Sequence, residues 1–222
     1  MFLGSSIAHG HTELGPRGRN GKQEAKSRVR QGALDNDMIQ QHLDGTLGVG
    51  AIPIDVDNLC SYGVIDIDTY PLDLVALNKK IIKLKMPLTI CRSKSGGAHL
   101  YVFLKERTEA TLIREALEEM ASILGHASAE IFPKQTTIQV DRGETGNFIN
   151  LPYFDHSETM RYGLDKTGNA FSLRDFLDHG ESNKVDKHSL MHQDFGVFED
   201  GFSDCPPCMQ SLIREGVGEG NR

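Results

Sequence analysis

Residues 62–70, with the sequence YGVIDIDTY, constrain the fold more than any other stretch of the chain. Alternating apolar and acidic positions predict a β-strand, on which side chains two apart share a face. Asp66 and Asp68 therefore lie on one face, about 6–7 Å apart at their Cα atoms, while Ile65 and Ile67 can be buried on the other. Two carboxylates this close repel by about 2–3 kcal/mol at an effective dielectric of about 20, so a strand that keeps both ionised needs a cation. Oxygen ligands favour Mg²⁺ or Mn²⁺; the alternative is an edge strand whose aspartates face water.

Composition narrows the class of protein. The chain has 222 residues, of which 38% are hydrophobic and 25% charged, values typical of a soluble protein with one catalytic-size domain plus extensions. It contains no apolar run of about 18 residues and no recognisable signal peptide, so we expect a cytoplasmic protein without a membrane partner. Its four scattered cysteines fit reduced thiols. The net charge of −7 argues against a surface coated with basic residues for nonspecific nucleic-acid binding, but it is compatible with an enzyme that has local basic clusters.

We expect four successive regions. Residues 1–44 form an arm and a basic helix packed on the core, residues 45–180 form a catalytic core, residues 181–200 form a polar linker, and residues 201–222 begin a further helical domain that is cut short. The basic helix is expected within residues 23–42. Its charges suit either a solvated helix face or a nucleic-acid contact. The candidates for that contact are Arg17, Arg19, Lys22, Lys26, Arg28 and Arg30.

Hydrophobic periodicity predicts an α+β core. Apolar residues at helical spacing indicate two core-packed helices, one of which Gly125 ends, and a third, short helix whose N-cap is Ser172. The expected helices cover residues 72–84, 109–124 and 172–180, and the expected strands cover residues 47–54, 62–70, 88–91, 99–104, 130–133 and 136–140, with another short strand near Arg161 and Tyr162.

The loop RSKSGGAH, residues 92–99, is the second informative stretch. Its two glycines let the backbone approach a ligand closely, and a cation, a hydroxyl, an exposed N–H and an imidazole together suit a polyphosphate. The histidine opens the following strand, so its ring is expected at the mouth of the loop. The loop matches no standard nucleotide-binding fingerprint, and a hairpin turn with ordinary surface residues is the alternative. The candidate nucleotide-binding residues here are Arg92, Ser93, Lys94, Ser95, Gly97 and His99.

Glu130, at the start of an expected strand, is the candidate third acid. A lone glutamate in this position is most often a surface residue. Beside an Asp-x-Asp pair, however, it completes a three-carboxylate site that can hold two metal ions and clamp the attacking and leaving oxygens of a phosphoryl displacement. The CPPC sequence at residues 205–208 resembles half of a zinc site, and because no second half is present we do not expect zinc.

Together, VIDID, SKSGGAH and a third acid on a later strand resemble the motifs of the archaeo-eukaryotic primase, or primase-polymerase, superfamily. The resemblance covers residues 45–162 and is closest to the branch found in TOTE conflict systems, phages and mobile elements. It implies an RRM-like sheet beside a second small α/β module, with the active site in the cleft between them. Asp66 and Asp68 then resemble the metal-binding pair, and His99 the histidine that contacts the triphosphate. Glu130 resembles the third acid, with Asp141 as the alternative. Further candidate nucleotide or template contacts are Lys134, Gln135, Asn147 and Asn150.

The resemblance also implies an activity. A template-dependent nucleotidyltransferase, acting as DNA primase or DNA polymerase, uses two Mg²⁺ or Mn²⁺ ions and nucleoside triphosphates to extend a 3′-hydroxyl or to start primers on single-stranded DNA. The expected partners are template, primer, dNTP or NTP, and a helicase or C-terminal helical domain in a longer chain. The expected setting is the cytoplasm, for a bacterial, phage or mobile-element protein. Two alternatives stay open: a metal-dependent nuclease that uses the same acids, and a catalytically idle module that binds single strands.

Overall fold

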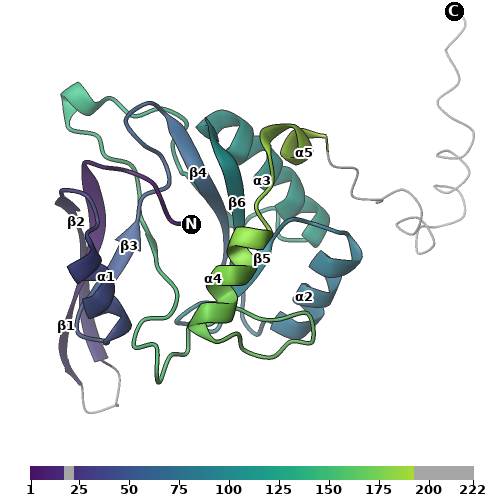
Figure 1. Ribbon diagram of the computed structural model, residues 1–222, viewed down its shortest axis with the longest axis horizontal. Coiled ribbons are helices and arrows are strands. Elements are labelled where there is room, and N and C mark those ends of the chain that lie inside the picture. The colour runs from purple at the N-terminus through teal and green to yellow at the C-terminus, as the bar shows by residue number, and fades with distance from the viewer. Residues whose placement is uncertain (18–22, 193–222) are drawn as a thin grey trace, which may run out of the picture.

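A computed structural model describes residues 1–17 and 23–192, which form two four-stranded antiparallel sheets and five α-helices (Figure 1). The first sheet has the strand order β2-β1-β3-β8, and the second has the order β5-β6-β4-β7. The strands are β1 Ala8–Arg17, β2 Gln23–Gln31, β3 Gly48–Ala51, β4 Leu59–Ile67, β5 Thr89–Arg92, β6 Ala98–Glu109, β7 Glu130–Phe132 and β8 Ile149–Asn150. The helices are α1 Asn36–Leu43, α2 Leu74–Lys83, α3 Ala110–Leu124, α4 Leu173–Ser182 and α5 Lys187–Met191. Among these described helices, none is both long and apolar enough to cross a membrane.

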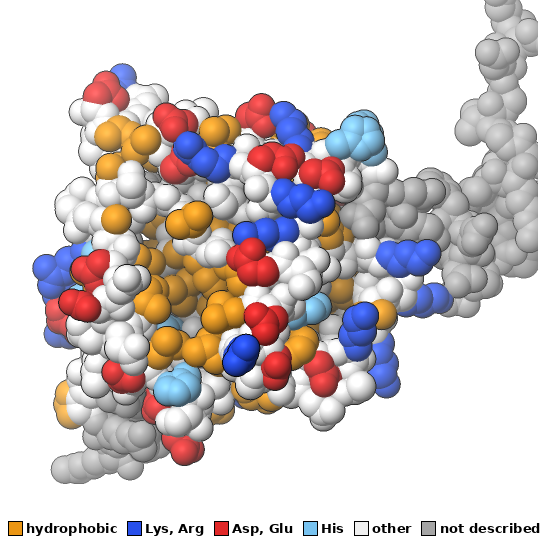
Figure 2. All heavy atoms as spheres, in the orientation of Figure 1, with side chains coloured by type: hydrophobic (Ala, Val, Ile, Leu, Met, Phe, Trp, Pro, Cys, Tyr) orange, Lys and Arg blue, Asp and Glu red, His pale blue; other side chains and the backbone are white. Residues whose placement is uncertain are grey.

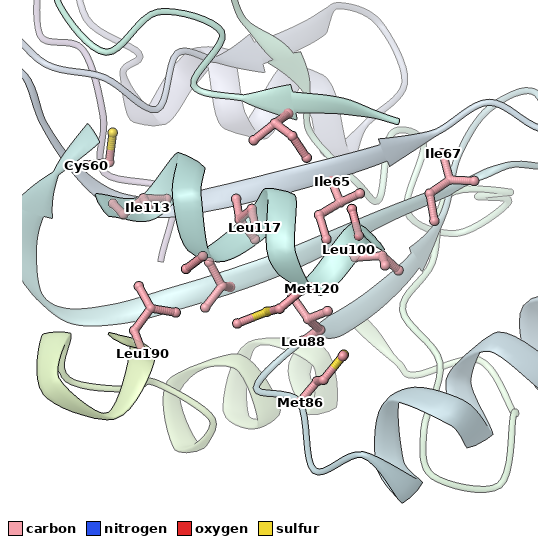
Figure 3. Close-up of a cluster of buried hydrophobic side chains, with 14 of the residues drawn as sticks. Cys60, Ile65, Ile67, Met86, Leu88, Leu100, Ile113, Leu117, Met120 and Leu190 are labelled. Atoms are coloured by element: carbon pink, nitrogen blue, oxygen red, sulfur yellow. The ribbon is translucent and has the colours of Figure 1, made fainter. Parts of the chain in front are cut away.

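The alternation of side chains along β4 separates two hydrophobic cores. Ile65 and Ile67 pack under α2 and α3, with Leu117 among their neighbours (Figure 3). Tyr62 and Val64 face the opposite way, into an aromatic cluster that also contains side chains of the first sheet. Burying one such side chain contributes about 1.5–3 kcal/mol, so β4 is held from both faces. Because β4 lies between β6 and β7, the interpretation of the acidic strand as an edge strand is wrong.

Most of the core elements match the sequence predictions, and the expected mixed α and β architecture with two sheet modules is confirmed. Helix α3 ends where Gly125 adopts a left-handed conformation with φ +88°. The side chain of Ser172 accepts a hydrogen bond from the backbone N–H of Asp175 at 3.1 Å, which is the expected N-cap of α4. That helix continues past Gly180 to Ser182.

The basic stretch near the N-terminus is a strand, so the prediction of a basic helix over residues 23–42 is wrong. Every residue of β2 from 24 to 31 is exposed, and the strand pairs with β1, which itself lies in the region expected to be a loop. Lys26, Arg28 and Arg30 alternate with small or apolar residues, a period of two that suits a strand. Only the end of the expected helix forms α1, for which the Asp35 side chain is the N-cap. Arg19 and Lys22 lie outside the described residues.

Two later expectations are also wrong. No strand forms over residues 136–140, where the chain instead leads into a 3₁₀ helix at Val140–Arg142. The first part of the expected linker is packed: Val185 forms backbone hydrogen bonds with Phe103 and Lys105 of β6, at 3.0 and 2.9 Å. Helix α5 follows and buries Leu190 in the core. Residues 193–222, which include the CPPC sequence, lie outside the described residues.

Candidate active site

Residues from three separate sequence motifs meet in one row of the second sheet. Asp66 on β4 pairs in register with His99 on β6 on one side and with Glu130 on β7 on the other. Directly paired residues of antiparallel strands point to the same face, so these three side chains share the face of Tyr62 and Val64, which looks toward the first sheet. The Nε2 atom of His99 lies 3.4 Å from Oδ1 of Asp66. The row therefore joins the acidic strand, the glycine-rich loop and the third acid.

Asp66 is the electrostatically unfavourable residue of this row. Its side chain is 13% exposed, and its Oδ1 atom is buried without a hydrogen-bond partner in the described structure. Burial, followed by the negative charges of Asp68 and Glu130, raises the pKa of the carboxyl to about 7, with Lys134 opposing the shift. The repulsion expected from the Asp-x-Asp spacing is thus present, with Glu130 as a second source.

His99 is neutral in this environment. Burial lowers the pKa of its imidazole to about 4; the charge of Asp68 raises this pKa, and the charge of Arg161 lowers it. Its Nδ1 atom lies 3.2 Å from the hydroxyl of Tyr101. At pH 7 the contact with Asp66 is therefore not an ion pair, and the ring carries a single N–H, on Nδ1 or on Nε2 according to the tautomer.

The two outer acids have partners of their own. Asp68 is exposed and accepts a hydrogen bond from the Tyr70 hydroxyl at 2.7 Å, and Glu130 pairs with Lys134 Nζ at 2.7 Å. In this arrangement, no three His, Cys, Asp or Glu side chains of the described residues lie close enough together to hold a metal ion. The donor set still fits a hard divalent cation, because it consists of carboxylates and includes the unpartnered Oδ1 of Asp66.

Of the two candidates for the third acid, Glu130 lies beside Asp66 and Asp141 does not. Glu130 is in register with Asp66 and its charge acts on that carboxyl. Asp141 is exposed in the 3₁₀ helix Val140–Arg142, outside both sheets.

The glycine-rich loop is a tight turn at the end of the same face. The N–H of Ser93 donates to the carbonyl of Gly97 at 2.9 Å, and a Cβ at Gly97 would lie 2.1 Å from the carbonyl oxygen of Ile67. Only glycine fits there. Lys94 and Ser95 are exposed, as expected for a surface loop that can reach a ligand. The Arg92 guanidinium instead donates to the Met160 carbonyl at 3.0 Å, so this residue holds the neighbouring chain segment.

The remaining candidates lie in two groups. Gln135 donates to the side-chain oxygen of Asn147 at 2.7 Å, so these two amides form one pair. Asn150 belongs to β8 of the first sheet, and its carbonyl accepts from the Tyr101 hydroxyl at 3.4 Å across the gap between the sheets. Figure 2 shows apolar side chains gathered in this region between the sheets, with acidic and basic side chains around them.

The basic residues of the N-terminal region are not part of this row. Lys26, Arg28 and Arg30 lie on β2, the outermost strand of the first sheet (Figure 1), and both arginines contact Glu13 of β1. Arg17 is the last residue of β1. These residues lie on a strand separate from the row, and the two alternatives given by the sequence, a solvated face and a nucleic-acid contact, both stay open for them.

Two residues near the row were missed by the sequence predictions. Tyr70 follows Asp68 within the same stretch, and its hydroxyl also forms a hydrogen bond with Ser95. Proximity in the sequence could have identified it. Arg161 lies over the ring of Phe154 at 5.1 Å, and its charge acts on His99. No motif surrounds Arg161, so no sequence signal was available.

Known proteins give one family match. The model of the TOTE conflict system, Archaeo-Eukaryotic Primase domain, matches residues 12–170, more than half of the chain. No curated protein matches. The AEP domain of cyanophage S-2L Primase-Polymerase is 10% identical over 78% of this chain and 88% of its own, with a TM-score of 0.42. The catalytic domain of primase Repb′, solved in complex with initiator DNA, is 11% identical over 85% of this chain and 92% of its own, with a TM-score of 0.36.

Proposed function

Because the chain belongs to the archaeo-eukaryotic primase family of TOTE conflict systems, we propose that it is a DNA-directed nucleotidyltransferase that extends a 3′-hydroxyl or starts primers on single-stranded DNA. The observation that carries the proposal is the row of His99, Asp66 and Glu130 across three neighbouring strands. The family match supports primase-type nucleotidyl transfer. The template, the metals and a role in phage or mobile-element replication are our proposals.

Asp66, Asp68 and Glu130 are the residues that would hold Mg²⁺ or Mn²⁺. Bound to such carboxylates, two divalent ions supply the acidity that deprotonates an attacking hydroxyl and the positive charge that stabilises departing pyrophosphate. A cation would also relieve the repulsion that raises the pKa of Asp66.

The protein's own groups bind and orient the nucleotide. The neutral ring of His99 donates one N–H to a phosphate oxygen, and the hydroxyl of Ser93, which has no partner in the described structure, donates another. The bare backbone at Gly97 lets the phosphates approach the sheet.

The direct test is synthesis on single-stranded DNA, with and without a primer, using dNTPs or NTPs and Mn²⁺ or Mg²⁺. We expect product from the wild-type chain and none from the double variant Asp66→Ala/Asp68→Ala, whose melting temperature should not fall. Synthesis by the double variant would contradict the mechanism. DNA cleavage without nucleoside triphosphates, in place of synthesis, would instead support a nuclease.

A further inference from the structure

Strand β2, the outermost strand of the first sheet, presents a row of cations to the solvent (Figure 1). Every residue of β2 from 24 to 31 is exposed, and Lys26, Arg28 and Arg30 alternate with Ser27 and Val29. Side chains two apart on a strand share a face and lie about 6.7 Å apart, so the three cations follow one face of the strand. The nine residues of β2 include three basic side chains and one acidic side chain, in a chain whose net charge is −7. Positive charge is therefore concentrated on this strand.

A neighbouring carboxylate neutralises only part of this charge. Glu13 of β1 contacts the guanidiniums of Arg28 and Arg30, which hold the pKa of its carboxyl below the usual value. No described carboxylate forms an ion pair with Lys26. Burial lowers the pKa of the adjacent His11, and the charge of Arg30 lowers it by more than the charge of Glu13 raises it. The row therefore keeps an excess of positive charge.

The cations project from the face of the first sheet that packs with the candidate active site. Arg28 pairs in register with His11, and His11 pairs with Val49 of β3, so these three side chains share a face. Val49 belongs to the buried cluster that also contains Val64 of β4. Val64 shares its face of β4 with Asp66, two residues further along. The basic row and the acidic row therefore border the same cluster.

The width of the first sheet sets the separation between the two rows. Strand β8 reaches the candidate site, because the carbonyl of Asn150 accepts from the hydroxyl of Tyr101, two residues beyond His99 on β6. Three strand spacings of about 4.8 Å separate β8 from β2, about 14 Å in all. A nucleic-acid strand with one phosphate about every 3.4 Å covers this distance in about four nucleotides. One template strand can therefore contact both places.

We propose that the basic face of β2 binds the sugar-phosphate backbone of the single-stranded template, about four nucleotides from the candidate active site. This inference rests on the proposed function. The three acids of the site repel a nucleic acid, so a separate basic surface is needed to hold the template beside them. The spacing of the cations, about 6.7 Å, matches every second phosphate of a helical strand. Contacts to phosphates hold the template in position without reading its sequence.

Equilibrium binding to a fluorescent single-stranded oligodeoxynucleotide tests this surface. The measurement is made in EDTA and without nucleotide, so it does not depend on the metals. We expect the triple variant Lys26→Gln/Arg28→Gln/Arg30→Gln to bind at least about tenfold more weakly than the wild type at about 50 mM salt. Each lost phosphate contact lowers the slope of log affinity against log salt by about 0.7 on a single strand, so the slope should fall by about 2.

A matched control removes the same charge elsewhere. The triple variant Lys79→Gln/Lys166→Gln/Arg174→Gln changes three exposed cations outside the first sheet, and it should keep the wild-type slope. An equal loss of affinity and slope in this control would overturn the inference, because net charge alone would then explain the result.

Glu13→Gln gives a test in the opposite direction, which also covers the case that the β2 variant fails to fold. Since the variant frees Arg28 and Arg30 from their carboxylate, we expect single-stranded DNA to bind about two- to fivefold more tightly. Weaker binding by Glu13→Gln would overturn the inference. Unchanged affinity and slope in the β2 variant, with synthesis by the wild type, would overturn this inference alone. Binding that depends on β2 without any synthesis would support the surface and contradict the proposed function.

Discussion

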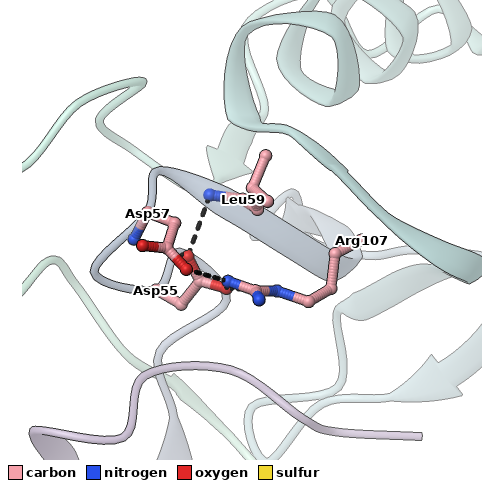
Figure 4. Close-up of polar contacts among 4 residues, drawn as sticks. All are labelled: Asp55, Asp57, Leu59 and Arg107. Atoms are coloured by element: carbon pink, nitrogen blue, oxygen red, sulfur yellow. Dashed lines mark hydrogen bonds and ion pairs between the residues drawn. The ribbon is translucent and has the colours of Figure 1, made fainter.

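Of the three Asp-x-Asp pairs in the chain, those at residues 55–57 and 66–68 lie at the two ends of β4, and the structure treats them in opposite ways. In the first pair, Asp55 accepts hydrogen bonds from the backbone N–H groups of Asp57 and Leu59, at 2.9 and 3.0 Å. Arg107 of β6 donates to both aspartates, at 2.8 and 2.7 Å (Figure 4). One guanidinium thus bridges both carboxylates of this pair, which closes the turn before β4.

The second pair has no such partner. Strand β6 places the neutral His99, rather than an arginine, beside Asp66. The positive charge of Lys134 acts on that carboxyl, but Lys134 is paired with Glu130. The same spacing of aspartates therefore stabilises a turn where the Arg107 guanidinium binds both carboxylates. Where no such cation binds, it leaves an unsatisfied anion. Unsatisfied charge of this kind is typical of functional sites.

The largest expected effect that tests this contrast comes from Asp66→Asn. We expect synthesis to fall by about 100-fold or more, since the variant removes a charge that the proposed metal site needs, and metal ions contribute several kcal/mol to such catalysis. Because the folded pKa of Asp66 is about 7, above its unfolded value, the ionised form destabilises the native state as pH rises. The variant should therefore be more stable than the wild type, by more at pH 8 than at pH 5, as measured by urea unfolding. If Asp66→Asn were less stable than the wild type at both pH values, Asp66 would not be an unfavourable charge, and the difference between the two pairs would not hold.

His42 is a buried group that becomes positively charged on protonation, so it tests the same contrast with the opposite sign of charge. Its Nδ1 atom accepts the N–H of Val49 at 3.1 Å and its Nε2–H donates to the Pro152 carbonyl at 2.9 Å, while burial lowers the pKa to about 4. A depressed histidine pKa contributes stability above the unfolded value of about 6.5 that is lost as pH falls toward 4. Between pH 7 and pH 4 we expect the wild type to lose about 2–3 kcal/mol more than His42→Gln, measured by urea unfolding at each pH. Parallel pH profiles for the two proteins would refute this.

The smallest effect is expected at the satisfied pair. Asp55→Ala leaves two backbone N–H groups without their acceptor and removes one of the two carboxylates that Arg107 binds, so we expect a loss of about 1–3 kcal/mol in the free energy of unfolding. Synthesis per folded molecule, measured below the melting temperature, should be unchanged. A loss of synthesis as complete as that of Asp66→Asn would remove the distinction between the two pairs.

The local parts of the site could be predicted from residue patterns. The period of two in VIDID identified a strand with acids on one face, and the glycines of the loop identified a close backbone approach. Such patterns act over a few residues, so they need no knowledge of the fold. The basic strand β2 was misassigned because its pairing partner β1 was not recognised, and pairing rather than propensity decides such a segment.

The sequence by itself determined the chemical groups of the protein: two closely spaced carboxylates, a histidine after a glycine turn, and a later glutamate. Only the tertiary structure decided which of these groups lie side by side, because strand register sets neighbours across distances that no local pattern encodes. Register brings Glu130 and His99 to Asp66 and gives Arg107 to the other aspartate pair. The charges were present in the sequence, and their pairing was settled by the fold.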